Sequence, residues 1–455
     1  MNGLLGQVEV DGRRVDVRVR DGHISELADV LHPAAGEEVI DGAGGALLPG
    51  LHDHHVHLLA TAAAMSSVSC GPPSVDDLGL LTAAMRSAPG TGWVRGVGYA
   101  ETVAGPMDRH LLDSLVADRP VRVQHRSGGL WMLNSLALRL TGLDRSTDRD
   151  VERDANGEAT GRLWRFDTRL RALLDEDATD ISVLCRTLHR YGVIGVTDAT
   201  PDLDNGAITL LAKAPLDLVL LGAPDDAGLP DGMRAGPRKL LLRDHDLPDL
   251  DELAASIRHE HDGGRPVAVH CVTRESLVLT VLALERVGTV DGDRIEHAAV
   301  VVPDMVPRLA DLRVAVVTQP SFIWLRGDDY VRDVAADDVN CLYPYASLLA
   351  AGMSVAPSSD APYGDLDPWR TIVAARARST SGDAVVAPEE RVSAVTALRG
   401  FLSPLLDPGG PPRQVTCGAA ADLCLLDAPL SEALAEPDAG HVRLVLHQGE
   451  VVFAA

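Results

Sequence analysis

The stretch LHDHHVHL, residues 51–58, places four histidines within eight positions. Successive side chains of a β-strand point to opposite faces, so His52 and His54 share one face of such a strand. His55 and His57 share the other face. At most one of the two histidine pairs can therefore point into a common site.

This stretch ends the first of eight β-like runs, and patterns typical of helices separate the runs. The runs lie at residues 45–57, 193–199, 216–222, 238–244, 265–271, 293–300, 313–320 and 353–362. Alternating strands and helices predict an α/β fold with a parallel sheet. Eight such units favour a closed (β/α)8 TIM barrel, whose active site lies at the carboxyl ends of the strands.

Other parts of the chain depart from this repeat. Both termini alternate like antiparallel strands and predict one small β-sandwich domain, built from residues 1–48 and 408–455. The barrel would then occupy residues 49–407. The interval of about 66–190 is too long for one βα connection, so it predicts an insertion after the first barrel strand, able to cover the barrel mouth as a lid.

The composition limits the partners and the location. With 455 residues and a formal charge of −25, the chain lacks the clustered positive charge that nucleic acid or an anionic membrane surface requires. A small-molecule substrate is expected instead, and a homodimer is left open. No signal peptide or membrane span is evident, and the six cysteines form no CxxC motif, so we expect a cytoplasmic protein with reduced thiols.

Polar residues interrupt five of the apolar runs. In a closed barrel these strand ends would meet at one mouth. They are His55, His57, Lys239, His270, His297 and Asp360. Imidazole and carboxylate groups suit a hydrolytic ion such as zinc, and two histidines at i and i+2 on one strand can bind the same metal.

Each of these residues also has an ordinary structural interpretation. His270 fits a hydrogen-bonded core histidine, and His297 fits an ion pair with the adjacent Glu296. Asp360 could simply open a turn before Pro362. Their common placement at strand ends of one predicted barrel favours a shared site.

Lys239 bears on the mechanism because only two of the 41 basic residues are lysines. A guanidinium stays protonated, whereas a buried lysine amine can become neutral and react. A neutral amine can take up carbon dioxide and form a carboxylate that bridges two metal ions. The alternative is an ordinary cation at the start of a strand, since Lys239 precedes an apolar run.

Several of these segments together resemble the amidohydrolase superfamily. They are PGLHDHHVHL, RKLLL, VAVHC, RIEHA and SSDAP. RPVRVQHRSGGLWMLNSLAL and NGEATGRLW, within the insertion, are similar to its N-substituted formamide deformylase-like (amidohydrolase 3) subfamily. The resemblance covers nearly the whole chain, and its motifs are specific in combination.

The resemblance implies a (β/α)8 barrel that holds one or two divalent metal ions, usually zinc. His55 and His57 would bind the more buried ion with Asp360. His270 and His297 would bind the more exposed one. Lys239, N6-carboxylated, would bridge the two.

The substrate pocket is expected to differ from that of relatives. Many relatives carry a histidine where this chain has Gly128 and Gly129, and His125 is the nearby substitute. Arg126 suits a substrate anion or a salt bridge. Trp131 follows in the same segment, while Trp324, after the seventh run, suits a pocket wall or loop packing. An acidic residue common after the segment TGRLW is replaced by Trp164 and Arg165.

The expected function is metal-dependent hydrolysis of a non-peptide C–N bond in an amide, formamide or cyclic amide. Asp360 would be catalytic, taking the proton of the attacking water and returning it to the leaving nitrogen. One alternative is a mononuclear deaminase, which would need a glutamate three residues after the fifth-strand histidine; here Glu275 follows by five. The other is a catalytically inactive scaffold or binding relative.

Overall fold

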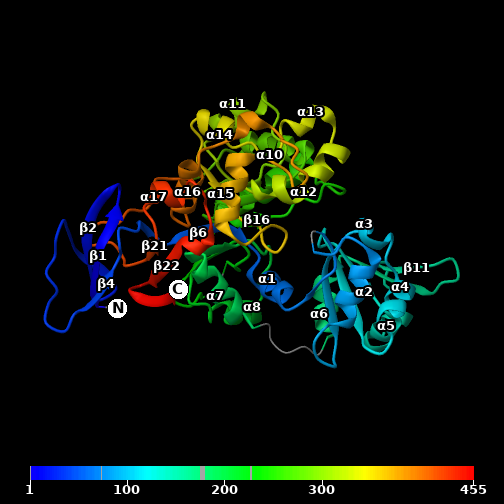
Figure 1. The fold of residues 1–455 in the computed structure, drawn as a ribbon. Coiled ribbons are helices and arrows are strands. Elements are labelled where there is room, and N and C mark those ends of the chain that lie inside the picture. Colours follow the sequence, from blue (N-terminus) through cyan, green and yellow to red (C-terminus); the bar gives the residue numbers. More distant parts are fainter. Residues whose placement is uncertain (1, 73, 175–179, 226–227) are drawn as a thin grey trace. The chain divides into compact units, whose positions relative to one another are not determined.

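A computed structural model describes residues 2–72, 74–174, 180–225 and 228–455 of the chain (Figure 1). The chain divides into two compact units. The chain up to Leu59 together with Ile181–Ala455 forms what we call the main unit, and Ala60–Asp180 forms the insertion unit. None of the described helices has the length and apolar character needed to cross a membrane.

The main unit contains two parallel sheets, and each of the eight predicted runs contributes a strand to one of them. The first sheet has the order β15-β14-β13-β6, with β15 Met233–Ala235, β14 Asp217–Leu220, β13 Val193–Asp198 and β6 Leu51–Val56. The second has the order β16-β17-β18-β19-β20, with β16 Arg238–Leu240, β17 Val267–Cys271, β18 Arg294–His297, β19 Ala315–Thr318 and β20 Val355–Pro357. Every residue of β6 and of β13 is buried, as is usual where helices cover both faces of a parallel sheet.

The strand ladders of the described residues form two open sheets and not the closed barrel that we predicted. β15 and β16 are separated by Gly236 and Pro237, and a proline has no N–H to offer to a ladder. On the other side, the segment after β20 leaves the extended conformation, with a φ of 52° at Asp360. The observed architecture is therefore a mixed α/β fold.

Individual backbone hydrogen bonds nevertheless join the two sheets at both edges. The N–H of Lys239 donates to the carbonyl of Leu221 at 3.1 Å. At the opposite edge, the N–H of Asp360 donates to His55 O at 2.8 Å, and the N–H of His57 donates to Ala361 O at 2.9 Å. The carboxyl ends of β6 and β20 are thus held side by side.

Helices connect and cover these strands. They are α7 Ser182–Arg190, α8 Asn205–Leu211, α9 Leu250–Asp262, α10 Arg274–Val287, α11 Met305–Leu312, α12 Ser321–Asp333, α13 Ala336–Val339, α14 Ala346–Ala350, α15 Pro368–Ala377, α16 Ala394–Phe401 and α17 Leu430–Ala433. α9 shows why these segments are helical: Asp249 and Glu252 form a capping box, and Leu253 and Ile257 are buried on one face.

The chain termini form two further four-stranded sheets that share one hydrophobic core. Their orders are β3-β2-β1-β4 and β23-β22-β21-β5, with β1 Gly3–Val10, β2 Arg13–Arg20, β3 His23–Ala28, β4 Glu38–Asp41, β5 Leu47–Pro49, β21 Leu423–Leu426, β22 Val442–His447 and β23 Glu450–Ala454. Val17 of β2 and Leu425 of β21 belong to the same buried cluster. Figure 1 shows the blue strands beside the red and orange ones. A separate terminal domain with the boundaries given above stays a prediction.

The insertion unit has a sheet of its own, in the order β11-β12-β10-β9-β8-β7. Its strands are β7 Val68–Ser69, β8 Val94–Tyr99, β9 Val121–His125, β10 Leu130–Leu133, β11 Val151–Arg153 and β12 Ala159–Trp164. Its helices are α2 Leu78–Arg86, α3 Glu101–Ala104, α4 Arg109–Leu115, α5 Ser135–Thr141 and α6 Asp167–Ala172, and α1 Leu58–Met65 leads into it. Two buried clusters form its core, and its role as a lid stays a prediction.

Candidate metal centre

Six polar residues on or just after five strands of the main unit form the candidate site. They are His55 on β6, His57 just after it, Lys239 on β16, His270 on β17, His297 on β18 and Asp360 after β20. Because all these strands are parallel, their carboxyl ends lie on the same side of the sheets.

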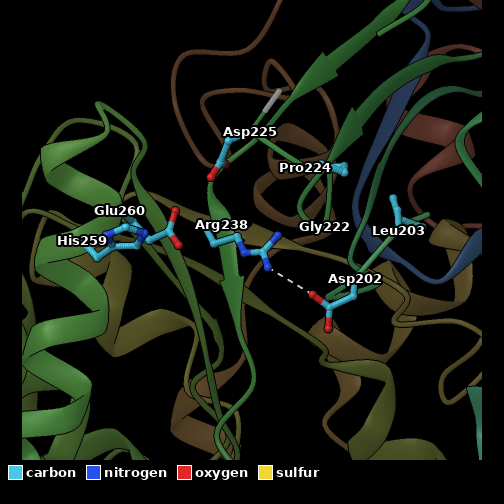
Figure 2. A pocket seen from close by; sticks show the side chains of 8 residues that line it. All are labelled: Asp202, Leu203, Gly222, Pro224, Asp225, Arg238, His259 and Glu260. Carbon is cyan, nitrogen blue, oxygen red and sulfur yellow. Dashed lines mark hydrogen bonds and ion pairs between the residues drawn. The ribbon is translucent and has the colours of Figure 1, made fainter. Parts of the chain in front are cut away.

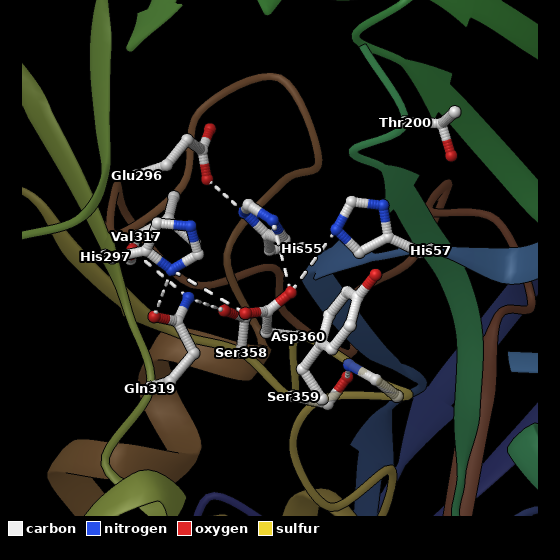
Figure 3. A network of polar contacts seen from close by, with 12 residues as sticks. His55, His57, Thr200, Glu296, His297, Val317, Gln319, Ser358, Ser359 and Asp360 are labelled. Carbon is white, nitrogen blue, oxygen red and sulfur yellow. Dashed lines mark hydrogen bonds and ion pairs between the residues drawn. The ribbon is translucent and has the colours of Figure 1, made fainter. Parts of the chain in front are cut away.

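The carboxylate of Asp360 lies among three imidazole rings (Figure 3). Its Oδ1 is 3.5 Å from Nε2 of His55 and 3.4 Å from Nε2 of His57. Its Oδ2 is 3.8 Å from Nδ1 of His297. One potential ligand atom each from His55, His297 and Asp360 lies within 4.8 Å of the other two.

This arrangement fits a cation. Oδ1 of Asp360 is buried, yet it accepts no hydrogen bond from any residue that the structure describes. Leaving a buried carboxylate oxygen without a partner costs free energy, and a divalent ion between this oxygen and the imidazole nitrogens would remove that cost. The residues present therefore suit the ion that the sequence predicts.

The surroundings of His55, His270 and His297 favour the neutral imidazole, which is the form that binds a metal ion. Burial lowers the pKa of His55 and His297 well below the usual histidine value, and the positive charge of Lys239 adds to the effect. Burial also lowers the pKa of His270 to about 3. The ring of His270 lies 4.5 Å from that of His297, measured between centroids, so it belongs to the same cluster.

Lys239 is buried inside the main unit, with its Nζ 3.4 Å from Nε2 of His55. Burial lowers the pKa of this amine, although the negative charges of Glu296 and Asp360 oppose the shift. A lowered pKa increases the neutral fraction, which is the form able to react.

Two of the candidate ligands have unusual backbone conformations. His297 has a φ of 72° and Asp360 a φ of 52°, in the left-handed region that residues other than glycine rarely adopt. Such conformations persist only where the surrounding structure imposes them, and they occur often at functional sites.

Two of the imidazoles have hydrogen-bond partners that the sequence did not predict. Glu296 bonds Nδ1 of His55, and Gln319 Oε1 lies 2.8 Å from Nδ1 of His297. Arg294 donates through Nε to the other oxygen of Glu296 at 2.6 Å. A signal was present, because Arg294 and Glu296 share one face of a strand in RIEH, but we considered Glu296 only as an alternative ion-pair partner of the adjacent His297.

The other two histidines of the opening stretch contact a different part of the main unit. His52 Nδ1 lies 2.9 Å from the carbonyl oxygen of Ser403, and His54 donates through Nε2 to Gly400 O at 3.1 Å. These partners belong to the end of α16 and the residues after it. The two faces of β6 therefore differ as alternation requires.

The residues predicted for the substrate pocket are divided between the two units. His125, Arg126 and Trp131 lie in the insertion unit, and Trp324 lies on α12 of the main unit. His125 has Ser127 Oγ at 2.8 Å and Glu101 Oε2 at 3.0 Å, both within its own unit. A role in substrate binding stays a prediction for all four.

A hollow of about 380 Å³ lies elsewhere in the main unit (Figure 2). Its lining residues are Asp202, Leu203, Gly222, Pro224, Asp225, Arg238, His259 and Glu260. Arg238 pairs with Asp202 at 3.1 Å and precedes Lys239 on β16. None of these lining residues is a candidate metal ligand.

Comparisons with known proteins agree with this fold. A family model described as the amidohydrolase family matches residues 38–401. N-substituted formamide deformylase of Arthrobacter pascens is 26% identical to the chain, and the match covers 94% of this chain and 90% of that protein.

Two solved structures show a similar fold. An uncharacterized metal-dependent hydrolase of Pyrococcus horikoshii OT3 matches with a TM-score of 0.73 and 18% identity, over 99% of each chain. Guanine deaminase of C. acetobutylicum matches with a TM-score of 0.54 and 12% identity, over 99% of this chain and 100% of that one.

The family match and the similar proteins define the chain as a hydrolase. The chain belongs to the amidohydrolase family, whose model covers most of its length. This confirms the resemblance predicted from the sequence and the predicted enzyme class, a hydrolase of C–N bonds other than peptide bonds. Membership of the family also implies a divalent metal ion.

Proposed function

We propose that this protein cleaves the C–N bond of an amide, formamide or cyclic amide in a small molecule, by metal-assisted hydrolysis. The observation that carries the proposal is the group of ligand atoms from His55, His297 and Asp360, all within 4.8 Å of one another. The N-substituted formamide deformylase to which the chain is similar supports the substrate class.

The assignment of ligands follows the resemblance to the amidohydrolase superfamily. His55, His57 and Asp360 would hold the more buried ion, for which imidazole nitrogen and carboxylate oxygen suit zinc. His270 and His297 would hold a second ion. Lys239, carboxylated on its Nζ, would then bridge the two, and its burial beside His55 supports this role.

The chemistry divides between the ion and the protein. When bound, a divalent ion lowers the pKa of water towards 7 and polarises the carbonyl group under attack. Asp360 accepts the proton of the attacking water on its carboxylate. It then returns this proton to the nitrogen that leaves.

The deaminase alternative lacks its glutamate at the expected place. Glu275 lies in the first turn of α10 and is exposed, whereas the candidate ligands are buried or half-buried. The inactive-scaffold alternative requires that ligands be missing. All six candidate ligands are present, which favours an active enzyme.

The proposal includes a closed barrel. We infer that the two parallel sheets close into a (β/α)8 barrel, and the hydrogen bonds of Lys239 to Leu221 and of Asp360 to His55 support the closure. A cytoplasmic location and a homodimer stay predictions.

A hydrolysis panel tests the proposed function. Metal-loaded and chelated enzyme are compared on amides, formamides, cyclic amides, esters and aminopurines. We expect turnover of at least one C–N substrate by the loaded enzyme, its loss on chelation, and its loss in Lys239→Ala. Activity that survives full chelation would contradict the mechanism, and turnover of aminopurines alone would favour the deaminase.

A further inference from the structure

The environment of Glu296 is the starting observation. Its side chain is completely buried, and each carboxylate oxygen has one cationic or N–H partner. Oε1 accepts a hydrogen bond from Nε of Arg294 at 2.6 Å. Oε2 bonds Nδ1 of His55, on a strand 241 positions away in the sequence. Burying this carboxylate without such partners would be strongly unfavourable.

The hydrogen bond determines the protonation pattern of His55. A carboxylate can only accept a hydrogen bond, so Nδ1 of His55 must carry the proton. In a neutral imidazole the other nitrogen, Nε2, then has a free lone pair. Nε2 is the atom that lies 3.5 Å from Asp360 Oδ1 and 3.4 Å from Lys239 Nζ.

Arg294 fixes the position of Glu296 and neutralises its charge. Besides its bond to Glu296, it donates through Nη2 to the carbonyl oxygen of His54 at 3.2 Å. One guanidinium therefore connects β18 directly to the backbone of β6, next to His55. The geometry of the pair is set by two strands at once, which leaves the imidazole ring little freedom to rotate.

The hydrogen-bond partner of His297 differs from that of His55. Its Nδ1 also has an acceptor, but this is the neutral amide oxygen of Gln319, at 2.8 Å. Nε2 of Gln319 in turn donates to Ser358 Oγ at 2.9 Å. An amide orients a ring, whereas a carboxylate also makes the imidazole a stronger electron donor.

We propose that Glu296, held by Arg294, is a positioning residue that fixes His55 as the Nδ1–H tautomer and strengthens Nε2 as a metal ligand. This inference rests on the proposed metal centre and adds to it a pair of residues that touches neither ion nor substrate.

Zinc titration of two matched variants tests the role. Glu296→Gln keeps the size of the side chain and removes its charge. Glu285→Gln makes the same change in an Arg–Glu pair on the surface, where Glu285 bonds Arg308 at 2.9 and 2.6 Å. The Kd for Zn²⁺ is measured by competition with a chromophoric chelator, on metal-free protein whose folding is checked by circular dichroism and thermal unfolding.

We expect Glu296→Gln to weaken zinc binding by about 10- to 100-fold, as loss of such partners does elsewhere. Glu285→Gln should bind like wild type. A lowered unfolding temperature of metal-free Glu296→Gln with an unchanged Kd would show a merely structural role and overturn the proposal. Wild-type protein that binds no stoichiometric zinc would contradict the proposed function itself, so the two failures are distinguishable.

A second measurement needs no folded Glu296 variant. In metal-free wild type with ¹⁵N-labelled histidine, long-range ¹H–¹⁵N spectra report which ring nitrogen carries the proton, and His55→Asn identifies the signal. We expect His55 to be protonated at Nδ1 only. Protonation at Nε2 would overturn the inference even if Glu296→Gln failed to fold.

Discussion

His54 and His55 are adjacent on β6, but their side chains have opposite surroundings. His54 is fully buried and bonds Gly400 O, while His55 lies among Glu296, Lys239 and Asp360. Consecutive positions of β6 therefore carry a structural imidazole on one face and a proposed metal-binding imidazole on the other.

We expect His55→Asn to lose most of its bound metal because it removes a ligand nitrogen. His54→Asn should keep a metal content near that of wild type, since its contacts lie on the other face. Metal per folded chain, determined by elemental analysis after gel filtration, checks this. Equal loss in both variants would mean that the ligand face of β6 is the opposite one.

Burial of His54 also predicts a pH dependence of stability. Its pKa is lowered to about 3, mainly by burial, whereas a histidine in an unfolded chain has a pKa of about 6.5. Between these values the unfolded state binds more protons than the folded state. The stabilisation is therefore complete above about pH 6.5 and is lost as the pH falls towards 3.

Urea unfolding of the metal-free protein at pH 7 and pH 5 measures this effect. One such group contributes at most about 1.4 kcal/mol per pH unit to the free energy of unfolding. We expect wild type to lose more stability on acidification than His54→Gln, which cannot take up the proton. The same loss in both proteins would contradict the assignment.

At the scale of elements, the turn after β20 positions Asp360. The N–H groups of Tyr363 and Gly364 donate to the carbonyl oxygen of Asp360, at 2.9 and 3.1 Å. A Cβ on Gly364 would lie 2.0 Å from the carbonyl oxygen of Ser359 and 2.9 Å from the ring of Phe322. Only glycine allows the chain to pass this close, so the turn depends on it.

Gly364→Ala should therefore displace Asp360 and weaken zinc binding by about tenfold or more, which corresponds to about 1.4 kcal/mol. Gly92→Ala is the control, because a Cβ there meets nothing within 4 Å. Zinc titration of both variants measures the change in affinity. If Gly364→Ala binds zinc as wild type does, the turn does not control the ligand.

At the scale of the whole molecule, each buried apolar cluster found among the described residues lies within one of the two units. Trp131 lies in the core of the insertion unit, and the guanidinium groups of Arg95 and Arg122 are 5.7 and 5.3 Å from its ring centroid. The candidate metal ligands all belong to the main unit. A substitution that destabilises the core of the insertion unit should therefore leave the metal content of the main unit unchanged.

Trp131→Ala should destabilise the insertion unit by about 3–5 kcal/mol, because it removes a large buried ring. Scanning calorimetry should show one transition moved to lower temperature, and the metal content should stay near wild type. A parallel fall in metal content would mean that the two units unfold together.

The sequence predicted much of this molecule because several of its signals are local. Apolar runs, turn residues and capping residues act over a few positions, which is why all eight runs contain strands. The spacing of His55 and His57, and the rarity of lysine, likewise selected residues that the structure brings together. Their types alone indicated a metal and a hydrolytic reaction.

Tertiary structure decided the partners of these residues. Glu296 follows Ile295 and precedes His297 in the chain, yet it bonds His55, since packing of β18 near β6 brings distant segments into contact. The division of the strand ladders into two sheets, the left-handed conformation of Asp360 and the division into two units have the same origin. Residue type and periodicity depend on the local sequence, whereas the choice of a hydrogen-bond partner depends on which strands pack together.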